Sequence, residues 1–170
     1  MDKIVRLIDT IAEWTGKILG WLILPLMGGL LFEVFSRYFL GAPTVWAYDV
    51  TYMLYGTIFM IGASYTLYKK AHIRTDMFYA KWSLRCQNIL DAIMYLLFFF
   101  PGIILFLVAG WDYAARSWMM GERSDASPWR PPIYPFKTVI AITGFLLLLQ
   151  GISEFFKSLY AIIKGRPYES

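Results

Sequence analysis

Long stretches without charged residues or histidine divide the chain and predict its helices. Two of them, Val50 to Tyr68 and Ala92 to Trp111, are nineteen and twenty residues long, close to the ~20 residues that a helix needs to cross a ~30 Å hydrocarbon core. Two more, Ile18 to Phe32 and Thr138 to Ser153, continue past isolated charges. Because a helix satisfies its own backbone in lipid, the pattern predicts transmembrane helices rather than strands. The predicted spans are about 18–40, 47–68, 89–111 and 138–163.

The segments between the spans differ in kind. Residues 1–17 place apolar side chains at helical spacing, which predicts an amphipathic helix, either interfacial or a cytoplasmic extension of the first span. Residues 75–88 mix apolar and basic side chains, and we expect a helix lying on the cytoplasmic face. Residues 121–135 hold five prolines and glycines. Prolines fix φ and remove backbone donors, so this segment is predicted to be a rigid periplasmic loop.

The distribution of basic residues predicts the orientation. With a cytoplasmic N-terminus, eleven Lys and Arg residues lie inside and five outside, so the positive-inside rule places both termini in the cytoplasm. A cleaved signal peptide is the alternative for the first apolar run, but Glu33 and Arg37 stand where its cleavage site should be. The predicted fold is therefore an all-α integral membrane protein with four transmembrane helices and interfacial amphipathic segments.

Composition supports a membrane protein and argues against an enzyme. Hydrophobic residues make up 58% of the 170 residues and charged residues 16%, against about a quarter charged in soluble domains. The single Cys86 and single His72 exclude an internal disulfide and a multi-histidine metal site within this chain. No nucleophile elbow or phosphate-binding glycine loop is present. We expect a non-enzyme without a cofactor of its own and without a nucleic-acid partner.

Charges inside the predicted spans are costly in lipid and are candidate functional residues. Glu33 and Arg37 lie four residues apart near the outer end of the first span, and Asp49 opens the second. We expect Arg37 to form an ion pair with Glu33 or with Asp49; a proton or ion relay is the alternative.

The fourth span carries a second polar stripe. Gln150, Glu154 and Lys157 follow the spacing i, i+4, i+7 and therefore share one helix face. No other predicted span offers matching charges at that depth, so we expect the stripe to face a partner helix rather than lipid; a transport path is the alternative. Gly16 and Gly20 form a GxxxG pattern, a weak dimerisation signal outside the apolar run.

Two segments resemble a known family. In residues 36–78 (SRYFLGAPTVWAYDVTYMLYGTIFMIGASYTLYKKAHIRTDMF) an Arg-Tyr pair ends the first span, a Pro-Trp turn and an acid follow, and a basic His-Ile-Arg-x-Asp segment comes after the second span. Residues 127–150 (SPWRPPIYPFKTVIAITGFLLLLQ) form the second segment. Both are similar to the small membrane subunit, the Q component, of tripartite ATP-independent periplasmic (TRAP) transporters. Asp49 stands where that family more often has Glu.

The resemblance implies a role. In such systems a periplasmic protein captures the substrate, often an organic acid, and a large membrane subunit, the M component, moves it with sodium. The Q component would be a static scaffold beside the M component in the bacterial inner membrane, with membrane lipids around it and the sodium ions in its partner. A homo-oligomeric channel or exporter is the second hypothesis. A membrane redox anchor is the third, although one histidine supplies axial ligands poorly.

Candidate residues follow from the charges and from the resemblance. Those expected at the subunit interface or in a structural role are Glu33, Arg37, Trp46, Asp49, His72, Arg74, Asp76, Gln150 and Glu154. Those expected to dock the binding protein are Trp129, Arg130 and Tyr134.

Overall fold

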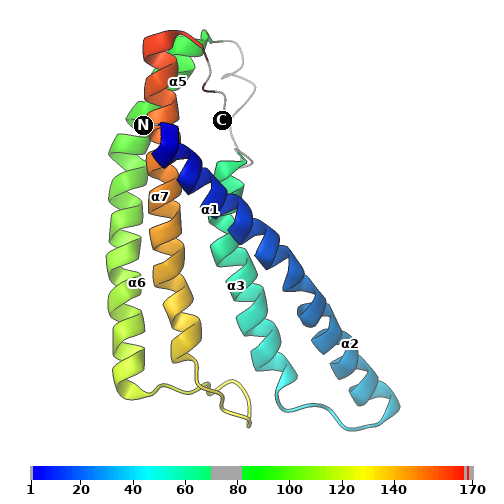
Figure 1. The fold of residues 1–170 in the computed structure, drawn as a ribbon. Coiled ribbons are helices and arrows are strands. Elements are labelled where there is room, and N and C mark those ends of the chain that lie inside the picture. Colours follow the sequence, from blue (N-terminus) through cyan, green and yellow to red (C-terminus); the bar gives the residue numbers. More distant parts are fainter. Residues whose placement is uncertain (1, 70–81, 167, 169–170) are drawn as a thin grey trace.

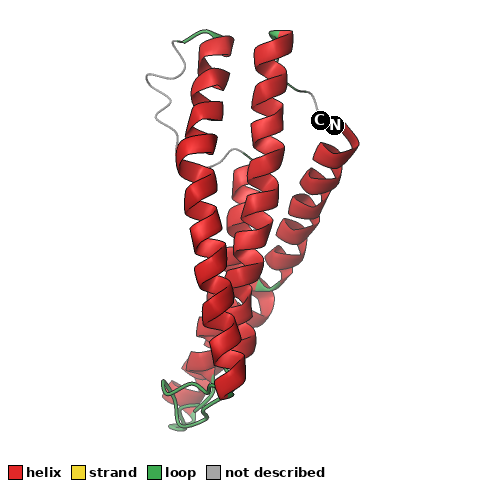
Figure 2. Cartoon of the chain, turned by 90° about the vertical axis from the view of Figure 1, so that its left-hand side faces the viewer, coloured by secondary structure: helices red, strands yellow, loops and turns green. Residues whose placement is uncertain are grey.

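The computed structural model describes residues 2–69, 82–166 and 168. These residues form an all-helical structure with four helices long and apolar enough to cross a membrane (Figures 1 and 2). The helices are α1 (Asp2–Trp21), α2 (Ile23–Phe39), α3 (Ala47–Tyr68), α5 (Leu84–Met94), a π-helical turn η1 (Tyr95–Phe99), α6 (Phe100–Met120) and α7 (Tyr134–Lys164). Helices α1 and α2 make up the first spanning unit, and α5, η1 and α6 the third.

The break between α1 and α2 is explained by a proline. Pro25 has no N–H to donate to the carbonyl of Trp21, and its ring crowds that carbonyl. The chain makes a turn at Leu22, whose N–H bonds to the Leu19 carbonyl at 3.0 Å. The two helices still follow one bent line (Figure 1). Residues 2–17 therefore extend the first spanning helix, the second of the two possibilities predicted for this segment.

Helix α7 lies at the centre of the arrangement. It packs against α6 on one side and α3 on the other, α2 packs on the far side of α3, and α1 crosses α3 and α7 (Figure 1). In the most apolar 18-residue stretch of α7, 39% of the residues are buried, against 6–11% in the other three spanning units. Within the described part of the chain, large apolar faces of α2, α3 and α6 are thus left uncovered.

The contact between α6 and α7 depends on glycine. A Cβ added to Gly144 of α7 would lie 3.1 Å from the Cα of Leu107, and one added to Gly110 of α6 would lie 2.8 Å from Cγ2 of Ile140. Small residues let helix backbones approach closely in membranes, where packing drives helix association. These glycines therefore hold α6 and α7 together.

The connection from α6 to α7 is compact. Helix α6 ends at Gly121, whose φ of 58° is the left-handed conformation common at helix ends. Ser124 N–H bonds to the Pro131 carbonyl at 2.8 Å, and Ile133 N–H bonds to the Glu122 carbonyl at 3.0 Å. Residues 121–133 form a loop closed by its own backbone, and the end of the molecule that carries it is called the loop end below. Helix α7 begins at Tyr134, with a proline in its first turn, where no N–H is needed.

Candidate functional site

Asp49 anchors the loop to α3. Its side chain lies in the first turn of α3, where the helix dipole favours an acid, and the residue is only 1% exposed. The Ser124 hydroxyl donates to Oδ1 at 2.5 Å, and the Ser127 hydroxyl donates to Oδ2. A carboxylate with two hydroxyl donors is a well satisfied buried charge. The described contacts of Asp49 thus fix the loop rather than pair with Arg37.

A second contact ties the same loop to α7. Lys137, 8% exposed, places its Nζ 2.5 Å from Oε2 of Glu122 and 4.0 Å from the ring centroid of Tyr113 on α6. The hydrogen bond from Lys137 lowers the pKa of Glu122 from its usual 4.5. The loop is therefore held by charge-assisted bonds on both sides.

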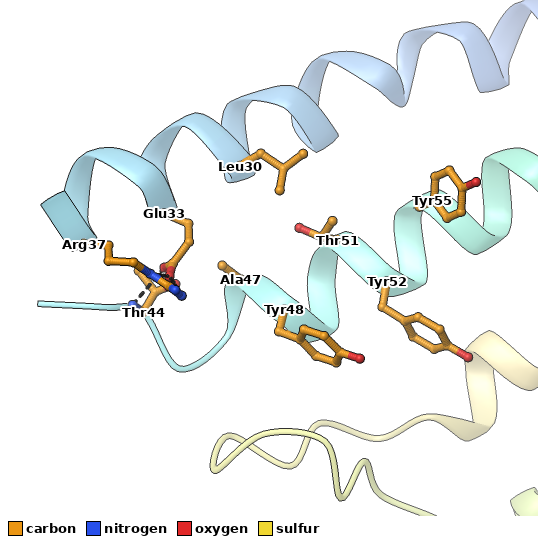
Figure 3. Close-up of a pocket in the computed structure, with 9 residues that line it drawn as sticks. All are labelled: Leu30, Glu33, Arg37, Thr44, Ala47, Tyr48, Thr51, Tyr52 and Tyr55. Atoms are coloured by element: carbon orange, nitrogen blue, oxygen red, sulfur yellow. Dashed lines mark hydrogen bonds and ion pairs between the residues drawn. The ribbon is translucent and has the colours of Figure 1, made fainter.

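Glu33 and Arg37 join α2 to the start of α3 (Figure 3). Arg37 donates to Glu33 Oε1 from Nε at 3.0 Å and from a terminal nitrogen at 2.5 Å. Thr44 donates to Oε2 through its backbone N–H at 2.9 Å and through its hydroxyl. The Arg37–Glu33 ion pair is one of the two pairings expected from the sequence. Trp46 lies nearby, stacked on Phe32 with 5.9 Å between ring centroids.

The polar stripe of α7 meets Asp9, an acid of α1. Asp9 Oδ1 accepts hydrogen bonds from Gln150 Nε2 at 3.2 Å, Ser153 Oγ at 2.9 Å and Lys157 Nζ at 3.0 Å. Lys157 also donates to Glu154 Oε1 at 2.7 Å. The expectation that no other span supplies a matching charge is therefore wrong: α1 reaches across α7 because it continues the first spanning helix.

The N-terminal helix turns one face toward α3 and α7 and leaves another uncovered by the described residues. Its buried residues are Val5, Ile8, Asp9, Ala12 and Leu19. The exposed face is apolar, with Ile4, Leu7, Ile11 and Trp14 exposed by 39–62%. Both faces are apolar enough to pack, and the one that carries an acid turns inward because Lys157 is there.

The loop tip carries the residues predicted to dock a binding protein. Trp129 is 47% exposed, and its backbone N–H donates to Ser127 Oγ at 3.3 Å. Arg130 has a φ of 46°, unusual for a non-glycine residue, and pairs with Asp125 at 2.6 Å. Tyr134 is less accessible, since its ring packs on Trp118 with 4.3 Å between centroids. Trp129 and Arg130 are therefore the accessible members of this group.

Three predicted residues, His72, Arg74 and Asp76, lie outside the described residues. The helix expected over residues 75–88 falls only partly within them, where α5 begins at Leu84. The serine partners of Asp49, the Thr44 contact of Glu33 and the Glu122 partner of Lys137 were not predicted. Ser124 and Ser127 lie in a loop, where no helical or strand periodicity indicates which residues the side chains contact. Their hydroxyl contacts with Asp49 could therefore not be inferred from the sequence pattern. A lysine inside the fourth span requires a carboxylate partner, but the sequence did not identify Asp9 as that partner.

The fold and these contacts describe an α-helical, multi-pass membrane protein whose buried polar groups join its own elements. The sequence profile of the DctQ component of tripartite ATP-independent periplasmic transporters matches residues 26–160. The chain belongs to this family, and it is the small, non-catalytic membrane subunit of a TRAP transporter. A search among curated proteins finds no match to the chain.

Proposed function

We propose that this chain is the static scaffold for the large membrane subunit of a sodium-coupled TRAP transporter in the bacterial inner membrane. The supporting observation is the unequal burial of the helices, since among the described residues α7 alone is substantially covered by the rest of the chain. Lipid does not drive apolar helix faces together, so packing and polar contacts must select a partner. The faces of α2, α3 and α6 provide the area for that partner.

The distribution of charge agrees with a static role. Asp49, Gln150 and Glu154 are 1%, 1% and 3% exposed, so they act within the chain and support an interface only indirectly. Glu33, Arg37 and Trp46 remain the candidates for direct contact, as do His72, Arg74 and Asp76. Co-purification tests this role: the tagged chain should retain the large subunit through detergent extraction. Recovery of the chain alone, as a homo-oligomer that passes solutes, would favour the channel alternative.

We further propose that the loop docks the periplasmic binding protein, which delivers an organic acid. The organic-acid class rests on the family resemblance alone. Trp129 supports the docking role because its ring is half-exposed on a loop fixed by Asp49 and Lys137. Trp129→Ala should raise the concentration of binding protein that gives half-maximal uptake. Trp111→Ala is the control, since Trp111 is 69% exposed on α6 instead of in the loop. Equal effects of the two changes would reject docking through the loop.

The proposed orientation places both termini in the cytoplasm and the loop in the periplasm. Cys86, exposed and the single cysteine of the chain, offers a direct test. A membrane-impermeant thiol reagent added to intact cells should leave Cys86 unlabelled. It should label Asp125→Cys in a Cys86→Ser background, because Asp125 lies in the exposed part of the loop. The reverse labelling pattern would invert the topology.

A further inference from the structure

A groove runs between α2 and α3 at the loop end of the molecule (Figure 3). Its volume is about 360 Å³, within the roughly 300–1,000 Å³ of typical ligand sites. One wall is lined by Leu30, Glu33 and Arg37 of α2. The opposite wall includes Ala47, Tyr48, Thr51, Tyr52 and Tyr55 of α3. Tyr48 and Tyr55 are 63% and 60% exposed, so the described part of the chain leaves the groove open.

The charged end of the groove presents a donor outward. Both oxygens of Glu33 are occupied, one by Arg37 and the other by Thr44. Arg37 uses Nε and one terminal nitrogen for this pair, and its side chain remains 59% exposed. A guanidinium has five N–H donors, so a second edge of Arg37 is available to an acceptor from outside. Paired donors on a guanidinium edge match the oxygens of a phosphate.

The length of the groove distinguishes between occupants. From Arg37 back to Leu30, and from Ala47 to Tyr55, the walls extend about 10–12 Å at 1.5 Å per residue. That is a little over a third of the ~30 Å hydrocarbon core, and Tyr55 lies near the middle of α3. One acyl chain reaches this far from a headgroup at the membrane edge. A spanning helix of a partner would need roughly two and a half to three times this length.

We propose that this groove binds one phospholipid from the leaflet at the loop end, with its phosphate on Arg37 and an acyl chain along Leu30 and Tyr55. The order of polar and apolar side chains supports this choice, because Arg37 lies at the end of the groove near the membrane edge and the more apolar walls continue toward the bilayer centre. Tyr48, 63% exposed, suits the boundary between headgroup and chain, where amphipathic rings are favoured. The inference rests on the membrane subunit role proposed above and adds a specific lipid to its partners.

The test measures phospholipid retained by the purified complex of this chain with its large subunit. Native mass spectrometry after extraction should find about one more lipid per chain in the wild type than in Arg37→Gln, with about fivefold lower occupancy in the variant, because a bidentate charge-assisted contact is lost. Arg116→Gln is the matched control: Arg116 pairs with Asp112 at the same spacing, at 2.6 Å, and is 66% exposed, but it does not line this groove. Its lipid content should equal that of the wild type.

A second variant tests the same groove without changing Arg37, in case Arg37→Gln misfolds. Thr51→Phe leaves the Arg37–Glu33 pair intact and fills the groove, so it should also lose the lipid. Co-purified large subunit is measured in the same samples, which separates loss of lipid from loss of assembly. Equal lipid content in Arg37→Gln and Arg116→Gln would overturn the proposal. So would displacement of the lipid by inorganic phosphate, or a lipid found on the isolated chain but absent from the complex, because the partner subunit would then fill the groove.

Discussion

Lys157 of α7 places its Nζ 2.8 Å from Oδ2 and 3.0 Å from Oδ1 of Asp9 on α1. The two side chains are 10% and 6% exposed, and the chain between them includes most of the protein. This ion pair ties the start of the first spanning helix to the end of the last one. It holds α1 against α7 at a position far from the loop of residues 121–133.

Asp9→Ala should therefore destabilise the protein. Removing one partner of a buried ion pair costs roughly 3–5 kcal/mol, and we expect about 3 kcal/mol because Glu154 still neutralises Lys157. Thermal or denaturant unfolding in detergent micelles measures the change. Glu13→Ala is the control on the same helix: Glu13 pairs with Lys17 at the surface and should change the unfolding free energy little. Equal effects of the two substitutions would contradict the anchoring role of Asp9.

Asp49→Ala should loosen the loop of residues 121–133. The change removes the acceptor for both serine hydroxyls, and hydrogen bonds to a charged group contribute roughly 1.5–3 kcal/mol each. Trypsin cleavage after Arg123 should become at least about a hundredfold faster, since the loss of about 3 kcal/mol or more makes the open loop more populated. Asp112→Ala is the comparison, because Asp112 is 58% exposed and pairs only on its own helix. An unchanged cleavage rate in Asp49→Ala would show that the loop does not depend on this anchor.

Glu122 should make stability depend on pH on the acid side. Its hydrogen bond with Lys137 lowers its pKa in the folded protein below the usual 4.5. The stabilisation is therefore fully present above about pH 4.5 and is lost as the pH falls through the lower folded-state pKa. The apparent Tm of the wild type should drop in this range. Glu122→Gln should start from a lower Tm at pH 7 and show a smaller drop. Parallel pH profiles for the two proteins would refute this assignment.

Substituting alanine for each of the two glycines of the GxxxG pattern should change the stability of the protein in opposite directions. A Cβ at Gly16 would lie 2.5 Å from the Tyr65 ring, whereas one at Gly20 would meet nothing within 4 Å. Gly16→Ala should lower the Tm, because α1 must move away from α3. Gly20→Ala should raise stability by up to about 1 kcal/mol, the helix-propensity difference between glycine and alanine. Loss of self-association in Gly20→Ala, seen by cross-linking, would instead indicate a seam between two copies of the chain.

The sequence predicted the helical class and the number of spanning units because these depend on the length of apolar runs and on backbone satisfaction in lipid. Both are local properties. The Arg37–Glu33 pair was also foreseeable, since i, i+4 spacing places the two on one helix face. The Asp9–Lys157 pair and the Asp49–Ser127 contact join segments far apart in the chain. Such contacts depend on how helices cross, which periodicity does not specify.

The interface roles of the candidate residues remain predictions. The exposure of each side chain indicates which residues can contact a partner directly. Arg37 and Trp129 are exposed, while Asp49 and Gln150 are almost completely buried. Substitutions at the first pair should affect partners directly, and substitutions at the second pair should act through the fold. This difference allows assembly defects to be separated from folding defects.

The scaffold role is tested most directly by sodium-driven uptake in proteoliposomes. Vesicles would contain this chain alone, the large subunit alone, or both, with the binding protein and labelled substrate outside. Uptake that requires both subunits, together with no flux through this chain alone, is the predicted result. Substrate flux through vesicles that contain only this chain would contradict the account.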